Sequence, residues 1–505
     1  MNYNFEENCF ENLGLLPDKV AFVGSNGELS WKELFEFVNK IKLTIKKLNL
    51  PKGYPILIYG HKQYSFPASI LACLVSEHPF IPIDELYPLE RVLDILDESG
   101  TNVLLDCTGN FPLAKDMTIV CFNDKKELTI SKNSSITLSK VPVFDLDPLS
   151  YILFTSGSTG KPKGVLIRKS SILSLVNWIK TTDFKMSSSD VFVNQSPFSF
   201  DVSLFDTFST LNYGASMLMV SQDLAKKPDL FRSLLESYKV TFWTSTPSFI
   251  YLYQREDWFS SVTLPFLKKF LFAGEALPVG IVNNLHNKFD TEDVYNAYGP
   301  TEATVITTFF RVDKTMSAKY IKLPIGFSKP NSSMITLPEN ATKENLGELV
   351  IIGENVAEGY LNRPEQEKDR FFIYNGKKAY KTGDLGYIVD QLIFCEGRND
   401  DQVKFNGYRI ELEEISNKIL SFNNIDEVRT VALKRDGKVI RLVAIYQAES
   451  EINITELKHY LKKVLPYYML PSDVLKVDSF PLNSSGKIDR NKLQEFYLME
   501  KKSRR

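Results

Sequence analysis

Apolar residues near the start of the chain alternate between the spacing of helices and that of buried strands. Ser30 and Glu33 form the capping-box pair that precedes many helices. The apolar face of the helix predicted after them consists of Leu34, Phe37, Val38, Ile41, Ile45 and Leu48. The elements predicted next are a strand at 55–59, a helix at 68–75, a strand at 80–83 and a helix at 89–96. This order indicates a large α/β domain with layered, largely parallel sheets.

The last hundred residues have a different pattern, which predicts a small α+β domain. A helix follows Glu411, and Pro466 stops a second helix that begins near residue 454. Between them, apolar runs at 428–433 and 439–446 flank an Asp436-Gly437 turn and predict a hairpin. The charged, polar stretch around residue 400 is typical of an exposed junction between domains.

Composition is that of a soluble globular protein. Of 505 residues, 43% are hydrophobic and 24% charged, and the net charge is only -2, so binding to nucleic acid or to an anionic membrane is not expected. The acidic N-terminus does not resemble a signal peptide, and no apolar run is long enough for membrane insertion. Five scattered cysteines and four histidines favour neither disulfides nor a metal cluster. We therefore expect a cytoplasmic protein.

A loop rich in glycine, hydroxyl groups and lysine separates two apolar runs. It reads Thr155-Ser156-Gly157-Ser158-Thr159-Gly160-Lys161-Pro162-Lys163-Gly164. Glycine lets backbone N–H groups converge on an anion, while hydroxyls and lysines bind and neutralise it, so the loop is typical of a phosphate site. Because Pro162 and then a strand follow the first lysine, a helix dipole is not the main anion-binding device. The alternative is a solvent-exposed hairpin loop.

Asp201 lies in an aromatic segment, Ser196-Pro197-Phe198-Ser199-Phe200-Asp201-Val202-Ser203. An unpaired carboxylate is costly to bury, so we expect a cationic partner for Asp201, and the ammonium of a substrate would suit. The alternative is that Asp201 caps the helix that follows it.

Three further segments place polar residues after predicted strands or turns. They are 270–276, 296–304 and 380–384. Ligand sites of α/β sheets gather at the carboxyl ends of strands, so 270–276 and the strand and loop at 242–249 should open on one cleft, and 296–304 follows the same plan. The third supplies the Asp384 carboxylate after a glycine turn, and a carboxylate of this sort can accept from both hydroxyls of a ribose.

These segments resemble the motifs of the adenylate-forming enzymes, a superfamily of acyl-CoA synthetases, luciferases and peptide-synthetase adenylation domains. The resemblance also includes 397–411 and 481–490 and covers almost the full length. It implies ATP and Mg²⁺ as cofactors. It further implies an N-terminal adenylation domain, 1–399, and a small mobile C-terminal lid domain, 400–505, with Asp400 as the hinge.

The resemblance also implies roles for individual residues. The ATP-binding residues would be Thr155, Ser156, Gly157, Ser158, Thr159, Gly160, Lys163, Gly274, Glu275, Ala276, Asn296, Ala297, Tyr298, Gly299, Thr301, Asp384, Arg398 and Lys487. The catalytic residues would be Lys487, Glu302 and Arg398, with Glu302 as the magnesium ligand. The substrate-binding residues would be Asp201, Ala273, Val305 and Lys487. In members that activate α-amino acids, the aspartate at this place holds the amino group.

This constellation contains no protein nucleophile with an adjacent base, so the substrates must react with each other. A bound carboxylate would attack the α-phosphate of ATP and release pyrophosphate, with the enzyme supplying orientation and charge stabilisation. The thiol of a phosphopantetheine arm on a carrier protein would then attack the acyl-adenylate. We expect a monomer with two partners, a small amino acid and this carrier.

The segments around Asp201, 243–249 and 298–305 further resemble the ligases that load D-alanine onto a carrier protein in teichoic acid D-alanylation. The substrate predicted from this resemblance is D-alanine, with another small amino acid of a peptide-synthetase pathway as the alternative. This chain departs from those ligases at Ala273, where they commonly have a cysteine. Asp201 argues against an acyl-CoA or acyl-carrier synthetase, whose substrate has no amino group to bind. Glu302, Asp384 and Lys487 argue against a non-catalytic nucleotide sensor.

Overall fold

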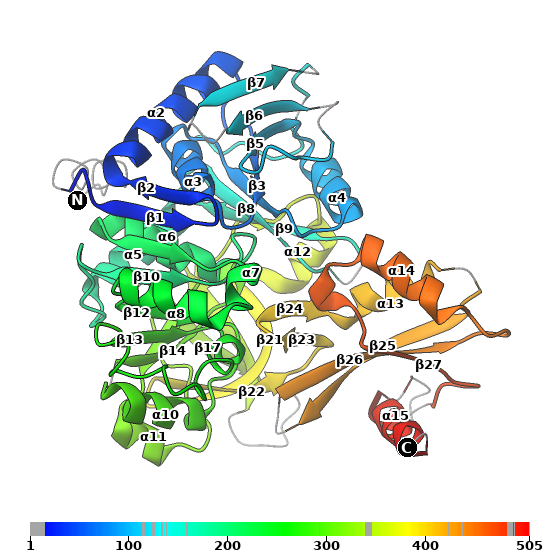
Figure 1. Ribbon diagram of the computed structural model, residues 1–505. Coiled ribbons are helices and arrows are strands. Elements are labelled where there is room, and N and C mark those ends of the chain that lie inside the picture. Colours follow the sequence, from blue (N-terminus) through cyan, green and yellow to red (C-terminus); the bar gives the residue numbers. More distant parts are fainter. Residues whose placement is uncertain are drawn as a thin grey trace. The chain divides into compact units, whose positions relative to one another are not determined.

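The chain forms two compact units in the computed structural model (Figure 1). The first unit contains the residues up to Glu85 together with 96–154 and 164–399, and the second contains 86–95, 155–163 and 400–505. The structure describes residues 16–503 except 114–116, 123–126, 133–134, 138, 158–159, 292, 339–345, 423, 436–437, 482–487 and 489. None of the helices in these ranges is long and apolar enough to cross a membrane.

Three sheets form the frame of the first unit. The nine-stranded sheet has the order β16 (Phe327–Ser328), β15 (Thr308–Arg311), β14 (Val294–Tyr298), β13 (Lys269–Phe272), β12 (Phe242–Ser245), β10 (Val191–Asn194), β11 (Ser216–Met219), β1 (Val20–Gly24) and β2 (Gly27–Ser30). The eight-stranded sheet has the order β19 (Gly359–Tyr360), β9 (Lys163–Arg168), β8 (Leu149–Thr155), β4 (Phe80–Asp84), β3 (Ile56–Gly60), β5 (Val103–Asp106), β6 (Thr118–Phe122) and β7 (Leu128–Lys132). The five-stranded sheet consists of β17 (Ser332–Pro338), β18 (Gly347–Gly353), β21 (Lys377–Val389) and β20 (Phe371–Tyr374), with β22 (Leu392–Arg398) paired to β21.

The helices assigned to the first unit lie between and around these sheets. They are α2 (Trp31–Leu48), α3 (Ser65–Val75), α5 (Lys169–Thr181), α6 (Val202–Tyr213), α7 (Gln222–Ala225), α8 (Pro228–Ser237), α9 (Pro247–Ile250), α10 (Val279–Phe289), the 3₁₀ helix η2 (Thr301–Ala303), α11 (Lys314–Lys319) and α12 (Pro364–Arg370). The helix α4 (Leu89–Ser99) has residues in both units.

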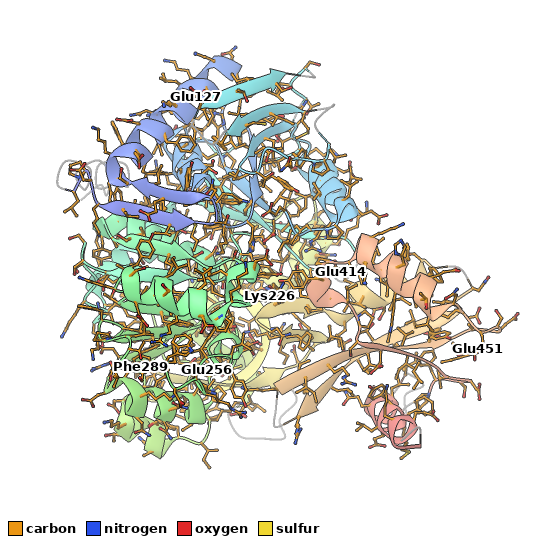
Figure 2. All side chains as sticks on the ribbon, viewed as in Figure 1. Glu127, Lys226, Glu256, Phe289, Glu414 and Glu451 are labelled. Atoms are coloured by element: carbon orange, nitrogen blue, oxygen red, sulfur yellow. The ribbon has the colours of Figure 1, made fainter. Side chains whose placement is uncertain are left out.

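One hydrophobic core joins the two larger sheets. It contains side chains from both sheets and from α2, α3, α5 and α6. A second core covers the nine-stranded sheet with α8 and α10. There Phe289, labelled in Figure 2, places its ring centroid 5.0 Å from those of Phe259 and Phe270. The predicted layered α/β architecture is confirmed, and its two larger sheets are largely parallel, whereas the five-stranded sheet is antiparallel.

The first predicted helix is confirmed as α2, including its capping box. The Ser30 side chain accepts from the Glu33 N–H, and the Ser30 N–H donates to the Glu33 carboxylate at 2.8 Å. All six residues of its predicted apolar face are buried. The helices and strands predicted up to residue 96 correspond to α2, β3, α3, β4 and α4, since local signals specified each of them.

The order of strands in the nine-stranded sheet reverses direction at β10. The chain runs from β10 to β11 on one side of β10 and then returns to β12 on the other side. In open parallel sheets, such a reversal leaves room for ligands beyond the carboxyl ends of the strands. The segments that follow β10, β12, β13 and β14 therefore meet at this edge.

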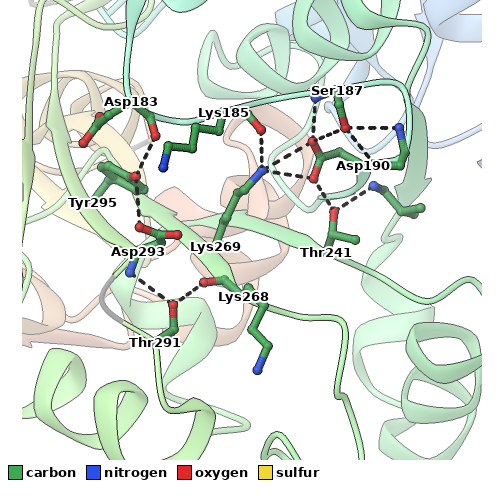
Figure 3. Close-up of polar contacts among 12 residues, drawn as sticks. Asp183, Lys185, Ser187, Asp190, Thr241, Lys268, Lys269, Thr291, Asp293 and Tyr295 are labelled. Atoms are coloured by element: carbon green, nitrogen blue, oxygen red, sulfur yellow. Dashed lines mark hydrogen bonds and ion pairs between the residues drawn. The ribbon is translucent and has the colours of Figure 1, made fainter.

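Polar residues at the opposite, amino-terminal edge of this sheet are paired with one another (Figure 3). Lys269, the first residue of β13, donates to Asp190 at 3.2 Å and to the Lys185 carbonyl at 2.9 Å. Thr241 also donates to Asp190, at 2.8 Å. Because Asp190 and Thr241 directly precede β10 and β12, these bonds fasten the starts of three neighbouring strands.

The second unit contains the small α+β domain predicted from the sequence. Its elements are β23 (Gln402–Phe405), β24 (Tyr408–Glu411), α13 (Leu412–Leu420), β25 (Glu427–Arg435), β26 (Lys438–Gln447), α14 (Ile454–Val464), the 3₁₀ helix η3 (Tyr467–Met469), β27 (Asp473–Lys476) and α15 (Arg490–Ser503). The predicted hairpin is β25 with β26, although its Asp436-Gly437 turn lies outside the described residues. Helix α14 ends two residues before Pro466, as expected.

One local prediction is wrong. Asp384 does not follow a glycine turn, because residues 380–384 all lie within the long strand β21. The register between β18 and β21 shifts between Glu348 and Val350, which leaves 382–384 in a bulge. Gly383 has the positive φ of 75° that the bulge requires. The glycine signal was real, but it marks an irregularity inside a strand.

Candidate active site

The predicted phosphate loop joins β8 to β9, and its strand–loop–strand structure is as expected. Ser158 and Thr159 lie outside the described residues. A Cβ on Gly157 would lie 2.2 Å from the carbonyl oxygen of Lys161, so only glycine fits there. Gly160 has a φ of 82° and donates its N–H to the Gly157 carbonyl at 3.1 Å. The loop is therefore folded on itself, and Lys163 is buried at its end.

Within the second unit, the Gly157 N–H donates to a carboxylate. Its acceptor is Oε2 of Glu414, labelled in Figure 2, at 3.1 Å. The other oxygen of Glu414 accepts from Arg91 at 2.9 Å, and both side chains are almost fully buried. Burial raises the pKa of Glu414, whereas the charge of Arg91 lowers it. A backbone N–H of the loop thus donates to an anion in this structure.

Asp201 is buried beyond the carboxyl end of β10 and makes no capping hydrogen bond to α6. Its φ of -62° and ψ of -28° are already helical, whereas a capping residue adopts extended angles. The capping alternative is therefore wrong. Burial and the charge of Asp201 together raise the pKa of Tyr151.

Ala273 and the segment after it occupy the end of β13. Ala273 is 2% exposed, and its N–H donates to the Ser245 carbonyl at the end of β12. Gly274 has a φ of 87°, and the Glu275 carboxylate accepts from the Ser248 N–H at 3.0 Å. Ala276 is exposed. This segment lies at the same edge of the sheet as Asp201 and as 246–249, the loop predicted to share its cleft.

The segment after β14 contains two consecutive β-branched residues with positive φ. Thr304 has a φ of 57° and Val305 one of 66°, a conformation that such residues rarely adopt. Asn355 holds this turn. Its side-chain amide donates to the Ala303 carbonyl at 3.1 Å, and its main-chain carbonyl accepts from the Thr304 hydroxyl at 2.7 Å. Strained backbone that is held in this way is characteristic of functional sites.

Gly299 lies directly against that strained turn. A Cβ there would be 2.6 Å from the Val305 carbonyl oxygen and 2.7 Å from the Ile306 Cα. We predict that Gly299→Ala displaces Val305 and lowers kcat/KM by at least about tenfold, because small misplacements are costly in a positioning site. Steady-state kinetics measure this loss.

The matched control is Gly280→Ala in α10, where an added Cβ has no atom within 4 Å. It should leave kcat/KM unchanged and stabilise the fold by up to about 1 kcal/mol. Full activity of a folded Gly299→Ala enzyme would show that Val305 does not need its observed position.

Tyr298, Asp384 and Arg398 form one hydrogen-bonded group. The Tyr298 hydroxyl donates to Oδ2 of Asp384 at 2.6 Å, and Arg398 donates to Oδ1 at 2.9 Å and to the Thr382 carbonyl at 3.1 Å. Burial and the charge of Asp384 raise the pKa of Tyr298 far above its usual value. The structure thus brings together three predicted ATP-binding residues from two sheets.

Glu302 is fully buried in the 3₁₀ helix η2. The Tyr360 hydroxyl donates to Oε1 of Glu302 at 2.8 Å. Asn296 uses its amide to donate to the Pro324 carbonyl at 2.8 Å, while Ala297 is buried in β14 and Thr301 begins η2. Lys487 lies outside the described residues, so the structure does not place it.

Sequence reasoning missed Asn355, Tyr360 and Lys62, which contact the predicted residues from elsewhere in the first unit. Asn355 holds the turn at Thr304, Tyr360 binds Glu302, and Lys62 contacts the segment that carries Asp201. For Lys62 the sequence offered only its place two residues after a continuous apolar strand, an end at which ligand-binding residues gather.

Comparison with known proteins identifies the family to which this chain belongs. The family model described as AMP-binding enzyme matches residues 9–361. The chain belongs to the AMP-binding enzyme family. The resemblance drawn from the motifs is thereby confirmed, and the chain is an adenylate-forming, ATP-dependent ligase.

Among its relatives, the D-alanine–D-alanyl carrier protein ligase of Bacillus licheniformis is 36% identical over 496 residues, which are 95% of this chain and 96% of that protein. The ligase of the same name from Bacillus cytotoxicus is 36% identical over 487 residues, 94% of this chain and 96% of that protein. The match therefore extends over nearly the full length of both relatives.

Solved structures of the same fold include an adenylation domain of Vibrio cholerae in complex with glycyl-adenosine-5'-phosphate. It has a TM-score of 0.84 and 21% identity and covers 99% of this chain and 98% of that one. An o-succinylbenzoate CoA synthetase of Bacillus subtilis has a TM-score of 0.80 and 18% identity, with 97% and 98% covered. Both confirm the adenylate-forming fold.

Proposed function

We propose that this member of the AMP-binding enzyme family activates D-alanine as its adenylate and transfers it to the phosphopantetheine thiol of a carrier protein, as in teichoic acid D-alanylation. The observation that carries the proposal is Asp201, a buried carboxylate at the carboxyl edge of the sheet that does not cap its helix. A substrate ammonium would compensate its burial. Relatives named for the same reaction support the proposal.

The first half-reaction joins the amino acid to AMP. A carboxylate oxygen of the amino acid attacks the α-phosphorus of ATP, and the bond to pyrophosphate breaks. Asp201 would hold the ammonium, with Ala273 and Val305 beside the α-carbon. Asp384 would accept from the ribose hydroxyls, and the loop at 155–163 would bind the phosphates. Arg398 and Lys487 would stabilise the charge that develops.

Glu302 is the carboxylate that would hold Mg²⁺, and the cation would offset the charge of the leaving pyrophosphate. Full burial of this carboxylate fits such a role, because a buried charge needs compensation. In the described ranges, no group of three or more His, Cys, Asp or Glu could hold a metal. Few protein ligands suit magnesium, which usually takes the remainder from phosphates and water.

In the second half-reaction the carrier thiol attacks the carbonyl carbon of the adenylate, and AMP leaves as the thioester forms. We propose residues 1–399 as the adenylation domain and 400–505 as the lid domain that carries Lys487, with the hinge at Asp400. The enzyme would act in the cytoplasm, where ATP is available, and as a monomer.

Amino-acid-dependent exchange of pyrophosphate into ATP tests the proposal directly. The panel is D-alanine, L-alanine, glycine, serine and short fatty acids, with thioester formation on a phosphopantetheinylated carrier as the second readout. D-Alanine should give the highest kcat/KM. A different best amino acid would indicate a peptide-synthetase enzyme, and activity with fatty acids alone would overturn the proposed function.

The small side chain of Ala273 leads to a further prediction, about selectivity between amino acids. It is buried beside the proposed pocket, and it leaves room of about one heavy atom compared with the cysteine common in D-alanine ligases. An apolar wall rejects a slightly different ligand mainly by crowding it. We predict that L-alanine and serine compete unusually well, and that Ala273→Cys improves discrimination for D-alanine by about 5- to 150-fold, or about 1–3 kcal/mol.

Ala215→Cys is the control, because Ala215 is equally buried but directly precedes β11, at the amino-terminal edge of the sheet. Its kcat/KM ratios for D-alanine, L-alanine and serine should equal those of the wild type. Unaltered ratios in Ala273→Cys would remove position 273 from the pocket.

A further inference from the structure

Lys62 is a lysine with a fully buried side chain, and it joins the two larger sheets of the first unit. It lies two residues beyond the end of β3 in the eight-stranded sheet, and its side chain is 0% exposed. Its ammonium reaches the end of β10 in the nine-stranded sheet. There it donates to the Asn194 side-chain oxygen and, at 2.6 Å, to the Ser196 carbonyl.

The same ammonium lies over the ring of Phe198, 4.7 Å from its centroid. Phe198 also stacks on Phe66 of α3, with a centroid distance of 4.6 Å and an interplanar angle of 10°. Lys62 therefore contacts three of the five residues from Asn194 to Phe198. That stretch leads directly to Asp201.

Asn194 also holds residues that follow Asp201 in the chain. Its side-chain amide donates to the Ser203 carbonyl at 3.1 Å and to Asp206 of α6 at 3.0 Å. The Ser203 hydroxyl in turn donates to the Phe200 carbonyl at 2.7 Å. Asp201 is thus held between two fixed points, and both depend on the position of Asn194.

Keeping a lysine in this place is costly for the fold. Burial lowers the pKa of Lys62 to about 7, although the charges of Asp206 and Asp84 oppose this. Burial also raises the pKa of Asp206 to about 8. Apolar residues of the same volume are often at least as stable as a buried ionisable group, so a buried, hydrogen-bonded lysine here points to a role in positioning its acceptors.

We propose that Lys62 is a positioning residue for the amino acid, fixing the segment from Asn194 to Asp201 so that the Asp201 carboxylate meets the substrate ammonium. This role rests on the proposed function and adds to it a residue that does not itself touch the substrate. It predicts that loss of Lys62 weakens binding of the amino acid much more than binding of ATP.

The test is Lys62→Met, which keeps the length of the side chain and removes its donors and charge. We expect KM for D-alanine in pyrophosphate exchange to rise by about 10- to 100-fold, the effect of losing hydrogen bonds to a charged group. KM for ATP should stay within about twofold of the wild type, because positioning acts through Asp201 alone. A merely structural lysine would lower the melting temperature and leave the ratio of the two KM values unchanged.

Lys269→Met is the matched control. Lys269 is also a mostly buried lysine bonded to a carbonyl and beside a carboxylate, but it lies at the amino-terminal edge of the same sheet (Figure 3). This variant should lose stability and keep both KM values. A rise in KM for D-alanine equal to that of Lys62→Met would overturn the assignment.

Lys62→Gln keeps the proposal testable if Lys62→Met does not fold, because glutamine retains a donor for the Ser196 carbonyl. Its KM for D-alanine should rise severalfold, and an unchanged value would overturn the role of Lys62. A wild-type enzyme inactive with every amino acid would instead overturn the proposed function. The two failures are therefore distinguishable.

Discussion

Replacing Asp201 by alanine is expected to lower kcat/KM for D-alanine by about 30- to 700-fold, or about 2–4 kcal/mol. The variant removes the buried carboxylate proposed to hold the substrate ammonium, so the ammonium would lose its proposed partner beyond β10. The loss should appear mainly in KM for the amino acid, because the groups proposed to bind ATP are elsewhere. Pyrophosphate exchange at varied D-alanine and fixed ATP measures it.

Asp201→Asn removes the charge and keeps the shape of the side chain. It should show most of the loss in kcat/KM for D-alanine that is expected for Asp201→Ala. The control is Asp223→Ala on α7, where the side chain is 85% exposed and pairs with Lys226 at 3.5 Å. It should behave as the wild type. Wild-type kcat/KM for D-alanine in Asp201→Ala would contradict the proposed contact.

Lys487→Ala is expected to suppress adenylate formation by about 100- to 1,000-fold, as loss of one group that stabilises developing charge does in other enzymes. Transfer from a chemically supplied D-alanyl-adenylate to the carrier should continue, because that step does not expel pyrophosphate. The two half-reactions are measured separately, by pyrophosphate exchange and by thioester formation.

Lys501→Ala provides the control within the same small domain. Lys501 lies on α15 and pairs with Asp473 at 3.1 Å with its side chain 46% exposed. Both half-reactions should be unaffected there. Equal loss of both half-reactions in Lys487→Ala would contradict the assignment of Lys487 to adenylate formation alone.

Local interactions explain why so many elements were predictable from sequence. The helix α2 has its capping box, its apolar face and its basic last turn all within Ser30–Leu48, so nothing distant was needed to specify it. The same holds for α14, which ends just before Pro466. The phosphate loop is similar, because Gly157 and Gly160 shape it through contacts within the loop itself.

Other features depended on neighbours that no local pattern reveals. Gly383 was compatible with a turn or a bulge, and pairing with β18 made it a bulge. Asp201 could have capped α6, but the surrounding segment holds it in a helical conformation that excludes capping. The strained turn at Thr304 and Val305 is held by Asn355, which lies 51 residues after Thr304.

The sequence by itself therefore determined the family, the two-part organisation of α/β followed by α+β elements, and the set of polar residues at the carboxyl edge of the strands. Short-range spacing encodes all of these. Only the tertiary structure decided how these residues are supported, since Lys62 meets Asn194 and Ser196 across 132 and 134 residues of chain. A lone lysine after a strand looks solvated in sequence. Its burial between two sheets is a property of packing, which no local pattern contains.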